Sequence, residues 1–258
     1  EATIEAVPNY GYIFQGWSDD VTDNPRTLTV NNDITLTANF VADPCIIREL
    51  PYFEDFDNLT EATPADGKTG VQPDCWTLAH RDVSMTPEYE PMVYYNAARA
   101  NSGDYSLLIN KRGIYAIPAI DANISDLVMS FYLYESGAAY QLEVGVMSDL
   151  NDASTFVPIA TFHNPNTTDI QYCEVNFSSY AGEGHFIAFH NTLRSGTSAY
   201  SCNYIDDLTV KYAPMNLTAV SADEEMGTVE GSGIVDYGTP ATITATANEH
   251  YHFIGWSD

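Results

Sequence analysis

The chain has 258 residues with 9 Lys or Arg and 36 Asp or Glu, so its formal net charge is −27 at pH 7. A charge of this sign and size excludes phosphate-directed nucleic-acid binding and docking on an anionic membrane. Hydrophobic residues make up 45% and charged residues 17% of the chain, which predicts a folded core rather than an acidic disordered tail. No stretch has the length and pattern of a transmembrane span or an export signal.

The first segment, residues 1–43, contains a sequence that returns at the other end of the chain after a shift of 239 residues. Each copy lacks a flank that the other has, so we expect residues 1–43 and 214–258 to be complementary parts of one repeated module. We also expect the chain to belong to a longer protein. The matching positions are Ala2-Thr3-Ile4 with Ala241-Thr242-Ile243, and Tyr12, Phe14 and Gly16-Trp17-Ser18-Asp19 with Tyr251, Phe253 and Gly255-Trp256-Ser257-Asp258.

Apolar residues of the repeat alternate with polar ones, as in Leu28/Val30 and Leu36/Ala38/Phe40, which predicts half-buried strands. The run Gly11-Tyr12-Ile13-Phe14-Gln15-Gly16-Trp17-Ser18-Asp19 resembles the divergent internalin-type B repeat of bacterial surface proteins; the second copy departs at His250, where that motif has Gly. The resemblance implies a small β-grasp-like unit that serves as a stalk or adhesive repeat. We interpret Trp17 and Trp256 as core residues of the module, with stacking on a sugar as the alternative.

Residues 44–213 are predicted to form one central domain, an all-β sandwich or jelly roll. Short apolar or alternating runs are separated by clusters of Gly, Asn, Asp and Ser, and no segment sustains an apolar stripe at helical spacing. The predicted strands are 105–109, 127–134, 141–147, 156–162, 173–177, 185–190 and 204–212.

The four cysteines have no C-x-x-C spacing, which argues against a zinc site. Their scatter fits an exported protein with up to two disulfides, for which three connectivities exist. We favour Cys45 with Cys75 and Cys173 with Cys202; four buried free thiols are the alternative. Trp76, directly after Cys75, is interpreted as a core residue beside a disulfide.

Four short motifs in the central domain resemble the MAM-like jelly roll of the cleaved-adhesin or choice-of-anchor type. Such domains occur in secreted surface proteins of anaerobic bacteria and in the haemagglutinin regions of gingipain-like proteases. The resemblance implies a non-catalytic adhesion domain, binding to a glycan or a host surface protein, and a structural calcium ion. The motifs are Leu50-Pro51-Tyr52-Phe53-Glu54-Asp55-Phe56-Asp57, Pro73-Asp74-Cys75-Trp76, Ser102-Gly103-Asp104-Tyr105-Ser106-Leu107 and Tyr204-Ile205-Asp206-Asp207-Leu208-Thr209-Val210.

Carboxylates near the two ends of the central domain are candidate calcium ligands, because the first and last strands of a jelly roll can lie side by side. Successive strand residues point to opposite faces, so at most one of Asp206 and Asp207 is expected to face an ion. The alternative is that these acids are solvated or cap turns. By the resemblance, the expected set is Asp206, favoured over Asp207, and Glu54 opposite, with the turn residues Ser102 and Asp104. Asp55 and Asp57 are in reserve.

Candidate ligand-binding residues are Tyr89, Tyr94 and Tyr95, because exposed tyrosines beside Asn and carboxylates can stack on sugars; packing is the alternative. The chain has no G-x-S-x-G, H-E-x-x-H or phosphate-loop motif, and we expect it not to be an enzyme. The sequence thus predicts a secreted or cell-surface recognition segment with the repeats as spacers. A purely structural stalk, or an accessory module of a secreted protease or glycoside hydrolase, are the alternatives.

Overall fold

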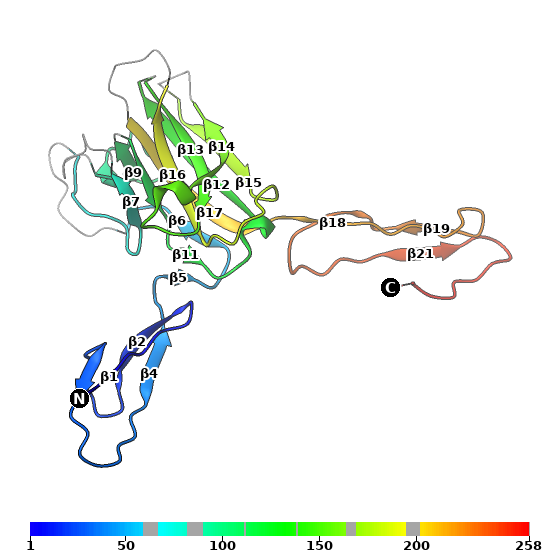
Figure 1. The fold of residues 1–258 in the computed structure, drawn as a ribbon. Coiled ribbons are helices and arrows are strands. Elements are labelled where there is room, and N and C mark those ends of the chain that lie inside the picture. Colours follow the sequence, from blue (N-terminus) through cyan, green and yellow to red (C-terminus); the bar gives the residue numbers. More distant parts are fainter. Residues whose placement is uncertain are drawn as a thin grey trace.

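A computed structural model describes residues 1–58, 67–81, 90–110, 112–137, 139–163, 169–194 and 202–257. Two packed β-sheets form a central sandwich, and a small β module projects from it at each end of the chain (Figure 1). The described residues contain strands and short 3-10 turns. The prediction of an all-β chain with a central sandwich is therefore confirmed.

The first sheet of the sandwich has five strands in the order β14-β13-β16-β10-β7. All of its neighbouring strands are antiparallel. The strands are β7 (Thr77–Arg81), β10 (Gly113–Ala116), β13 (Tyr140–Met147), β14 (Val157–Phe162) and β16 (Phe186–Leu193).

The second sheet has six strands in the order β15-β12-β17-β9-β8, with β6 also paired to β17. Its long central strands β12 and β17 alternate buried and half-buried residues, as the period-two pattern of their sequences predicts. The strands are β6 (Tyr52–Glu54), β8 (Met92–Tyr95), β9 (Tyr105–Asn110), β12 (Leu127–Ser136), β15 (Gln171–Asn176) and β17 (Cys202–Tyr212).

The core lies between the two sheets and is built around Trp76, which is buried as predicted. Its indole stacks on Phe189 at 6.3 Å and makes an edge contact with Phe56 at 5.8 Å. The indole Nε1 donates a hydrogen bond to the hydroxyl of Tyr52, 3.3 Å away, so the polar atom of a buried ring has a partner. Two 3-10 turns, η2 (Ile124–Asp126) and η3 (Ala153–Thr155), lie at sandwich edges.

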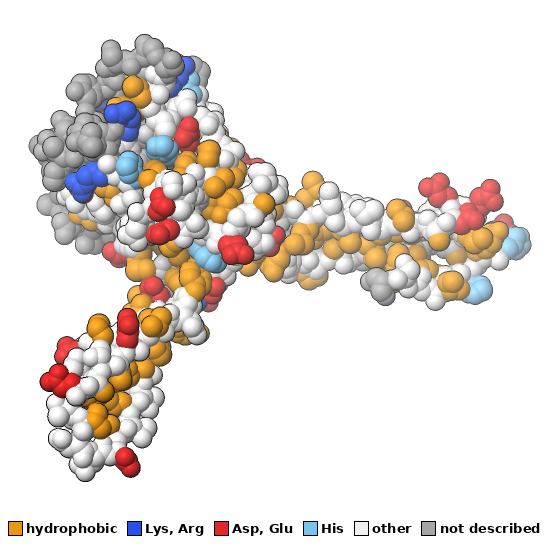
Figure 2. Space-filling view, viewed as in Figure 1, with side chains coloured by type: hydrophobic (Ala, Val, Ile, Leu, Met, Phe, Trp, Pro, Cys, Tyr) orange, Lys and Arg blue, Asp and Glu red, His pale blue; other side chains and the backbone are white. Residues whose placement is uncertain are grey.

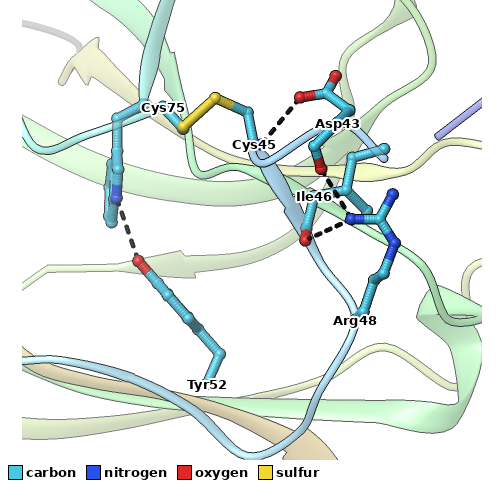
Figure 3. The surroundings of a disulfide bond; sticks show 7 residues. Asp43, Cys45, Ile46, Arg48, Tyr52 and Cys75 are labelled. Carbon is cyan, nitrogen blue, oxygen red and sulfur yellow. Dashed lines mark hydrogen bonds between the residues drawn. A yellow bond between two sulfur atoms is a disulfide. The ribbon is translucent and has the colours of Figure 1, made fainter. Parts of the chain in front are cut away.

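A disulfide between Cys45 and Cys75 fastens the segment that enters the sandwich to the residue before Trp76 (Figure 3). The same segment carries β5 (Ile46–Ile47), which pairs in parallel with β11 (Ala119–Ile120). Arg48 donates hydrogen bonds to the carbonyls of Asp43 and Gly11, at 2.7 and 2.6 Å, and so ties the N-terminal module to this junction.

The second predicted disulfide does not form, since neither Cys173 nor Cys202 is in a disulfide. Cys173 lies opposite Phe131 of β12, whereas Cys202 lies opposite Ser136 on the other side of the same strand. Five residues along a strand span about 17 Å, far more than the Cα separation of about 7 Å that a disulfide tolerates. Burial raises the pKa of the Cys173 thiol to about 12, so this cysteine behaves as a small apolar core residue.

The N-terminal module consists of two antiparallel strand pairs, β1 with β3 and β2 with β4. Trp17 is only 6% exposed, as expected for a core residue. Its Nε1 donates a hydrogen bond to the carbonyl of Asp23, 2.9 Å away. Tyr10 stacks on His185 of the sandwich at 4.2 Å. The strands are β1 (Ala2–Ile4), β2 (Tyr12–Trp17), β3 (Arg26–Leu28) and β4 (Ala38–Ala42).

The C-terminal module also has two antiparallel pairs, β18 with β20 and β19 with β21. Tyr237 stacks on Tyr212 at the end of β17, at 3.9 Å. Trp256 is 41% exposed, so it is not a core residue within the described residues, unlike Trp17. The strands are β18 (Met215–Leu217), β19 (Gly227–Glu230), β20 (Gly233–Val235) and β21 (Thr244–Ala247).

Candidate functional site

A row of tyrosine rings covers the outer face of the six-stranded sheet. On β12, the side chains of Phe131 and Leu133 are fully buried in the core, so the alternating residues Tyr132 and Tyr134 point to the other face. The same alternation turns Tyr172 outward, because Cys173 beside it is buried. We use the name tyrosine face for Tyr94, Tyr132, Tyr134, Tyr172 and Tyr204.

The sheet order brings these rings into contact across strands. Tyr132 lies directly opposite Tyr172, and their ring centroids are 5.4 Å apart. Tyr134 lies opposite Tyr204 at 5.8 Å, and Tyr94 makes an edge contact with Tyr204 at 5.4 Å. These edge-to-face contacts form two groups, Tyr132 with Tyr172 and Tyr204 with Tyr94 and Tyr134, and in each group a ring is held by a ring from another strand.

Arg99 is the cation of the tyrosine face. Its guanidinium carbon lies 4.7 Å from the ring centroid of Tyr204, 5.7 Å from that of Tyr94 and 5.8 Å from that of Tyr134. The guanidinium also donates a hydrogen bond to the Tyr204 hydroxyl. Burial is the main cause that raises the pKa of Tyr204, so this phenol stays neutral. Such cation–π contacts contribute about 0.5–1 kcal/mol each at exposed sites.

The rings of the tyrosine face differ in exposure, from the buried Tyr204 to the exposed Tyr172. Tyr204 is buried beneath Arg99, and Tyr94, Tyr132 and Tyr134 are half-buried. Tyr172 on the edge strand is 53% exposed, and its hydroxyl donates a hydrogen bond to Glu174 at 3.1 Å. A ligand therefore meets Tyr172, the half-buried rings and the half-buried Arg99 first, while Tyr204 lies beneath them.

The structure separates the three tyrosines that the sequence proposed as ligand residues. Tyr94 belongs to the tyrosine face, whereas Tyr95, the next residue on β8, points to the opposite side and packs edge-on against Tyr105 at 5.3 Å. Tyr89 lies outside the described residues. Sequence reasoning missed Arg99 and most of the tyrosine face. The available signal was the Tyr positions that alternate with buried residues in 131–134 and 171–175.

Three carboxylates contact the loop 101–104, which follows Arg99 and leads into β9. Asp206 accepts hydrogen bonds from the backbone N–H groups of Asn101 and Ser102, at 2.6 and 3.0 Å. Asp207 accepts from the Asn101 Nδ2 and the Ser102 hydroxyl, at 2.6 and 2.7 Å. We call Asp57, Asp206 and Asp207 together with this loop the acid-held loop.

Both adjacent aspartates contact the loop 101–104 through their side chains, although successive residues of a regular strand point to opposite faces. Strand β17 has an irregularity opposite Ser130–Tyr132, where the register shifts by one residue. Asp207 has a left-handed φ of 46° at this point. The bulge interrupts the period of two and turns both carboxylates to one side.

Asp57 holds the loop from its other end. Its Oδ1 accepts hydrogen bonds from the backbone N–H groups of Asp104 and Tyr105, both at 3.1 Å. A Cβ on Gly103, which has a left-handed φ of 53°, would overlap the Asp57 carboxylate. The loop therefore needs glycine at this position for its conformation and for the close approach of Asp57.

Glu54 does not join this cluster. It pairs with Leu208 across β6 and β17, but its Oε1 accepts a hydrogen bond from the backbone N–H of Phe56 at 3.0 Å. Burial is the main cause that raises the pKa of Glu54. Burial also raises the pKa of Asp206 to about 6, against the lowering effect of its amide partners.

Carboxylate and hydroxyl oxygens are the ligands that Ca²⁺ prefers, so the donor chemistry of the acid-held loop suits that ion. As the side chains lie, however, their oxygens face amide protons. Within the described ranges, no three His, Cys, Asp or Glu side chains are gathered so that they could hold a metal ion. Asp104 donates its backbone N–H to Asp57. Ser102 donates its backbone N–H to Asp206 and its hydroxyl to Asp207. The Asp55 carboxylate accepts a hydrogen bond from the backbone N–H of Asp57 at 3.1 Å.

Both ends of the chain match one protein family. Residues 1–44 and 207–258 match the divergent InlB B-repeat domain. The match agrees with the repeat seen in the sequence and covers the two terminal modules together with the last part of β17. No curated protein sequence matches the chain.

Solved structures similar to this chain include adhesin and carbohydrate-binding domains. The K1 cleaved adhesin domain of Lys-gingipain from Porphyromonas gingivalis W83 has 13% identity and a TM-score of 0.45, with 64% of this chain and 99% of that chain covered. The K2 cleaved adhesin domain of Lys-gingipain has 11% identity and a TM-score of 0.44, with 62% and 98% covered. The CBM22-1 xylan-binding domain from Paenibacillus barcinonensis has 14% identity and a TM-score of 0.37, with 62% and 92% covered.

Proposed function

We propose that this chain is a non-catalytic extracellular recognition segment of a bacterial surface protein, and that its sandwich binds a glycan on the tyrosine face. The observation that carries the proposal is the row of cross-packed tyrosine rings, open at Tyr172. Aromatic rings stack on the apolar faces of sugars, while phenol hydroxyls at their rim form hydrogen bonds. Rings that are held by one another also lose little conformational freedom when a ligand binds.

The charge of the chain narrows the class of glycan. At −27 the protein repels polyanions, and Glu174 lies beside the most exposed ring of the tyrosine face. Arg99 is the single cation of the tyrosine face, and its one positive charge is small beside the net charge of the chain. The proposed ligand is therefore a neutral glycan rather than one rich in uronic acid or sulfate.

The Cys45–Cys75 disulfide and the terminal modules support an extracellular setting. Structural disulfides persist in oxidising compartments and are rare where thiols are kept reduced. The B-repeat modules at both ends act as spacers in this proposal. No helix among the described residues is long and apolar enough to span a membrane.

Replacing Tyr172 by Ala is expected to weaken glycan binding about tenfold or more, a loss of about 1.4 kcal/mol, because the most accessible stacking ring is removed. Affinity electrophoresis in gels with neutral β-1,4-linked galactan or xylan, and with polygalacturonate, measures retardation of the full chain. Tyr12→Ala is the matched control, since Tyr12 is 54% exposed but lies in the N-terminal module.

Retardation by polygalacturonate alone, or equal losses in both variants, would contradict glycan binding on the tyrosine face. No retardation by any polysaccharide would favour the structural stalk. Binding to a host surface protein, or service as an accessory module of a secreted protease or glycoside hydrolase, would then need separate tests.

We propose further that the acid-held loop takes a structural calcium ion. Three carboxylates crowd one four-residue loop, and the most buried of them, Asp206, has no Lys, Arg or His partner among the described residues. Asp206, Asp207 and Ser102 would supply oxygen ligands, with Asp57 and Asp104 at the same loop. The ion would offset the repulsion between the carboxylates.

Excess calcium is expected to raise the melting temperature of the full chain by about 5–10 °C over chelator. This corresponds to about 2.7 kcal/mol at a hundredfold excess over Kd. Asp207→Asn should abolish the shift because it removes the charge of a half-buried ligand that accepts only side-chain hydrogen bonds from the loop. The control is Asp149→Asn, whose carboxylate only caps a turn at Asn151. Identical melting curves with calcium and with chelator would show that the loop binds no structural calcium ion.

A further inference from the structure

Phe53 is an exposed aromatic ring on the same outer face of the six-stranded sheet as the tyrosine face. Its neighbour on β6, Tyr52, packs against the core and accepts a hydrogen bond from the indole of Trp76. Successive strand residues point to opposite faces, so Phe53 points outward. It is 55% exposed, and it makes no contact with another ring among the described residues. The outer face therefore carries two open rings, Tyr172 and Phe53.

The strand register places these two rings on opposite sides of β12 and β17. Phe53 lies opposite Thr209 of β17, and Thr209 lies opposite Ser130 of β12. Ser130 in turn lies opposite Glu174 of β15, two residues from Tyr172. Three spacings of about 4.8 Å between strands, with an offset of about 7 Å along the strand, put the Cα atoms of Phe53 and Tyr172 about 16 Å apart.

The surface between the two rings is lined by hydroxyl groups. Thr209 lies between the fully buried Leu208 and Val210, so it points to the outer face. Ser130 is half-buried on the same face. In the part of the chain that the structure describes, neither side-chain hydroxyl makes a hydrogen bond to another protein group. We use the name cross-strand strip for Tyr172, Tyr132, Ser130, Thr209 and Phe53.

The cross-strand strip carries no excess of charge. Glu174 borders it on β15, and Lys211, two residues after Thr209, borders it on β17. In the view of Figure 2, acidic side chains lie on the sandwich and on both arms, whereas the Lys and Arg side chains in view lie on the sandwich only. A polyanion that continues past the strip would therefore meet acidic surface and be repelled. The strip suits an uncharged ligand.

We propose that the glycan is a linear chain that crosses the strands from Tyr172 to Phe53, with Phe53 as a second stacking ring. This inference rests on the glycan binding proposed above and adds the length and the direction of the ligand. A span of about 16 Å is longer than a disaccharide, so a short ligand reaches only one of the two rings. A longer chain stacks on both, and the hydroxyls of Ser130 and Thr209 form hydrogen bonds with the sugar units between them. The cross-strand strip thus binds the interior of a polymer in preference to a single terminal sugar.

Isothermal titration calorimetry of the full chain with β-1,4-linked xylose and galactose oligosaccharides, from the disaccharide to the hexasaccharide, tests the proposal. The affinity should rise with the length of the ligand. Phe53→Ala should weaken binding of the hexasaccharide about tenfold or more, because one of two stacking rings is lost. It should leave binding of the disaccharide within about twofold, because Tyr172 and Tyr132 still hold it. Tyr172→Ala should weaken binding of both ligands.

Two further variants test whether the ring of Phe53 itself is responsible. Phe53→Tyr keeps a stacking ring and should bind the hexasaccharide within about twofold of the unaltered chain. Phe40→Ala is the matched control, since Phe40 is 40% exposed but lies in the N-terminal module, and it should leave both affinities unchanged. The melting temperature of Phe53→Ala should stay within about 2 °C of that of the unaltered chain, because more than half of this residue is exposed.

The outcomes separate this inference from the proposed function. Equal affinities for the disaccharide and the hexasaccharide would overturn the path across the strands. So would a hexasaccharide affinity that Tyr172→Ala lowers and Phe53→Ala does not, and both results would leave glycan binding at Tyr172 in place. A hexasaccharide affinity that neither variant lowers, or no binding of any oligosaccharide, would overturn the inference and the proposed function together.

Discussion

Replacing Cys45 and Cys75 together by Ala is expected to lower the free energy of unfolding by about 3–4 kcal/mol. The bond joins residues 30 apart in the sequence. Closing a loop of this size removes chain entropy from the unfolded state worth about 3.6 kcal/mol at 25 °C. Urea unfolding of the full chain followed by circular dichroism measures the change in the midpoint.

Cys202→Ala is the control for this variant, since Cys202 lies in the same sandwich but is not in a disulfide and closes no loop. It should cost less than about 1 kcal/mol. Trp76 follows Cys75 directly and packs on Phe189, so loosening the junction also frees the ring at the centre of the core. A double variant as stable as Cys202→Ala would show that the sandwich does not depend on this bond.

The strands of the sandwich could be predicted well because burial imposes a period of two. Strand β12 is the clearest case: alternation predicted residues 127–134, and the strand runs from Leu127 to Ser136. The same alternation placed the cores of β13 and β17. Shorter strands such as β6 and β10 were not predicted, because three or four residues are too few to show a period of two.

The tyrosine face could not be predicted because it depends on which strands are neighbours. Tyr94, Tyr134 and Tyr204 meet only because β12 and β17 pair and β9 joins β17 to β8. Sequence order also misled the pairing of Cys173 with Cys202, whose strands are separated by β12. Local pattern shows which face a residue takes, but not which strand lies beside it.

Strand β17 links the two parts of the candidate site. Tyr204 lies on the tyrosine face, and Asp206 and Asp207 hold the loop 101–104. Arg99, which lies over Tyr204, is only two residues before Asn101. The hydrogen bonds of the loop therefore hold the backbone next to Arg99. A change in the loop is expected to shift Arg99 and the rings that it contacts.

Gly103→Ala is expected to destabilise the full chain by about 2–4 kcal/mol and to weaken glycan retardation. A left-handed φ costs a residue with a Cβ about 1–2 kcal/mol. At Gly103 that Cβ would also overlap the Asp57 carboxylate, which must then release the N–H groups of Asp104 and Tyr105. Urea unfolding measures the stability, and affinity electrophoresis measures glycan binding at the tyrosine face.

Gly70→Ala separates these two causes, because Gly70 has a similar φ of 69° but no atom within 4 Å of an added Cβ. It should show only the conformational cost of about 1–2 kcal/mol. Adding Asp57→Ala to Gly103→Ala removes the clash, so the double variant should lose less stability than the sum of the two single changes. If the losses of stability in the two single variants add up to the loss in the double variant, Asp57 and Gly103 act independently. The conformation of the loop would then depend on its contacts with β17 alone.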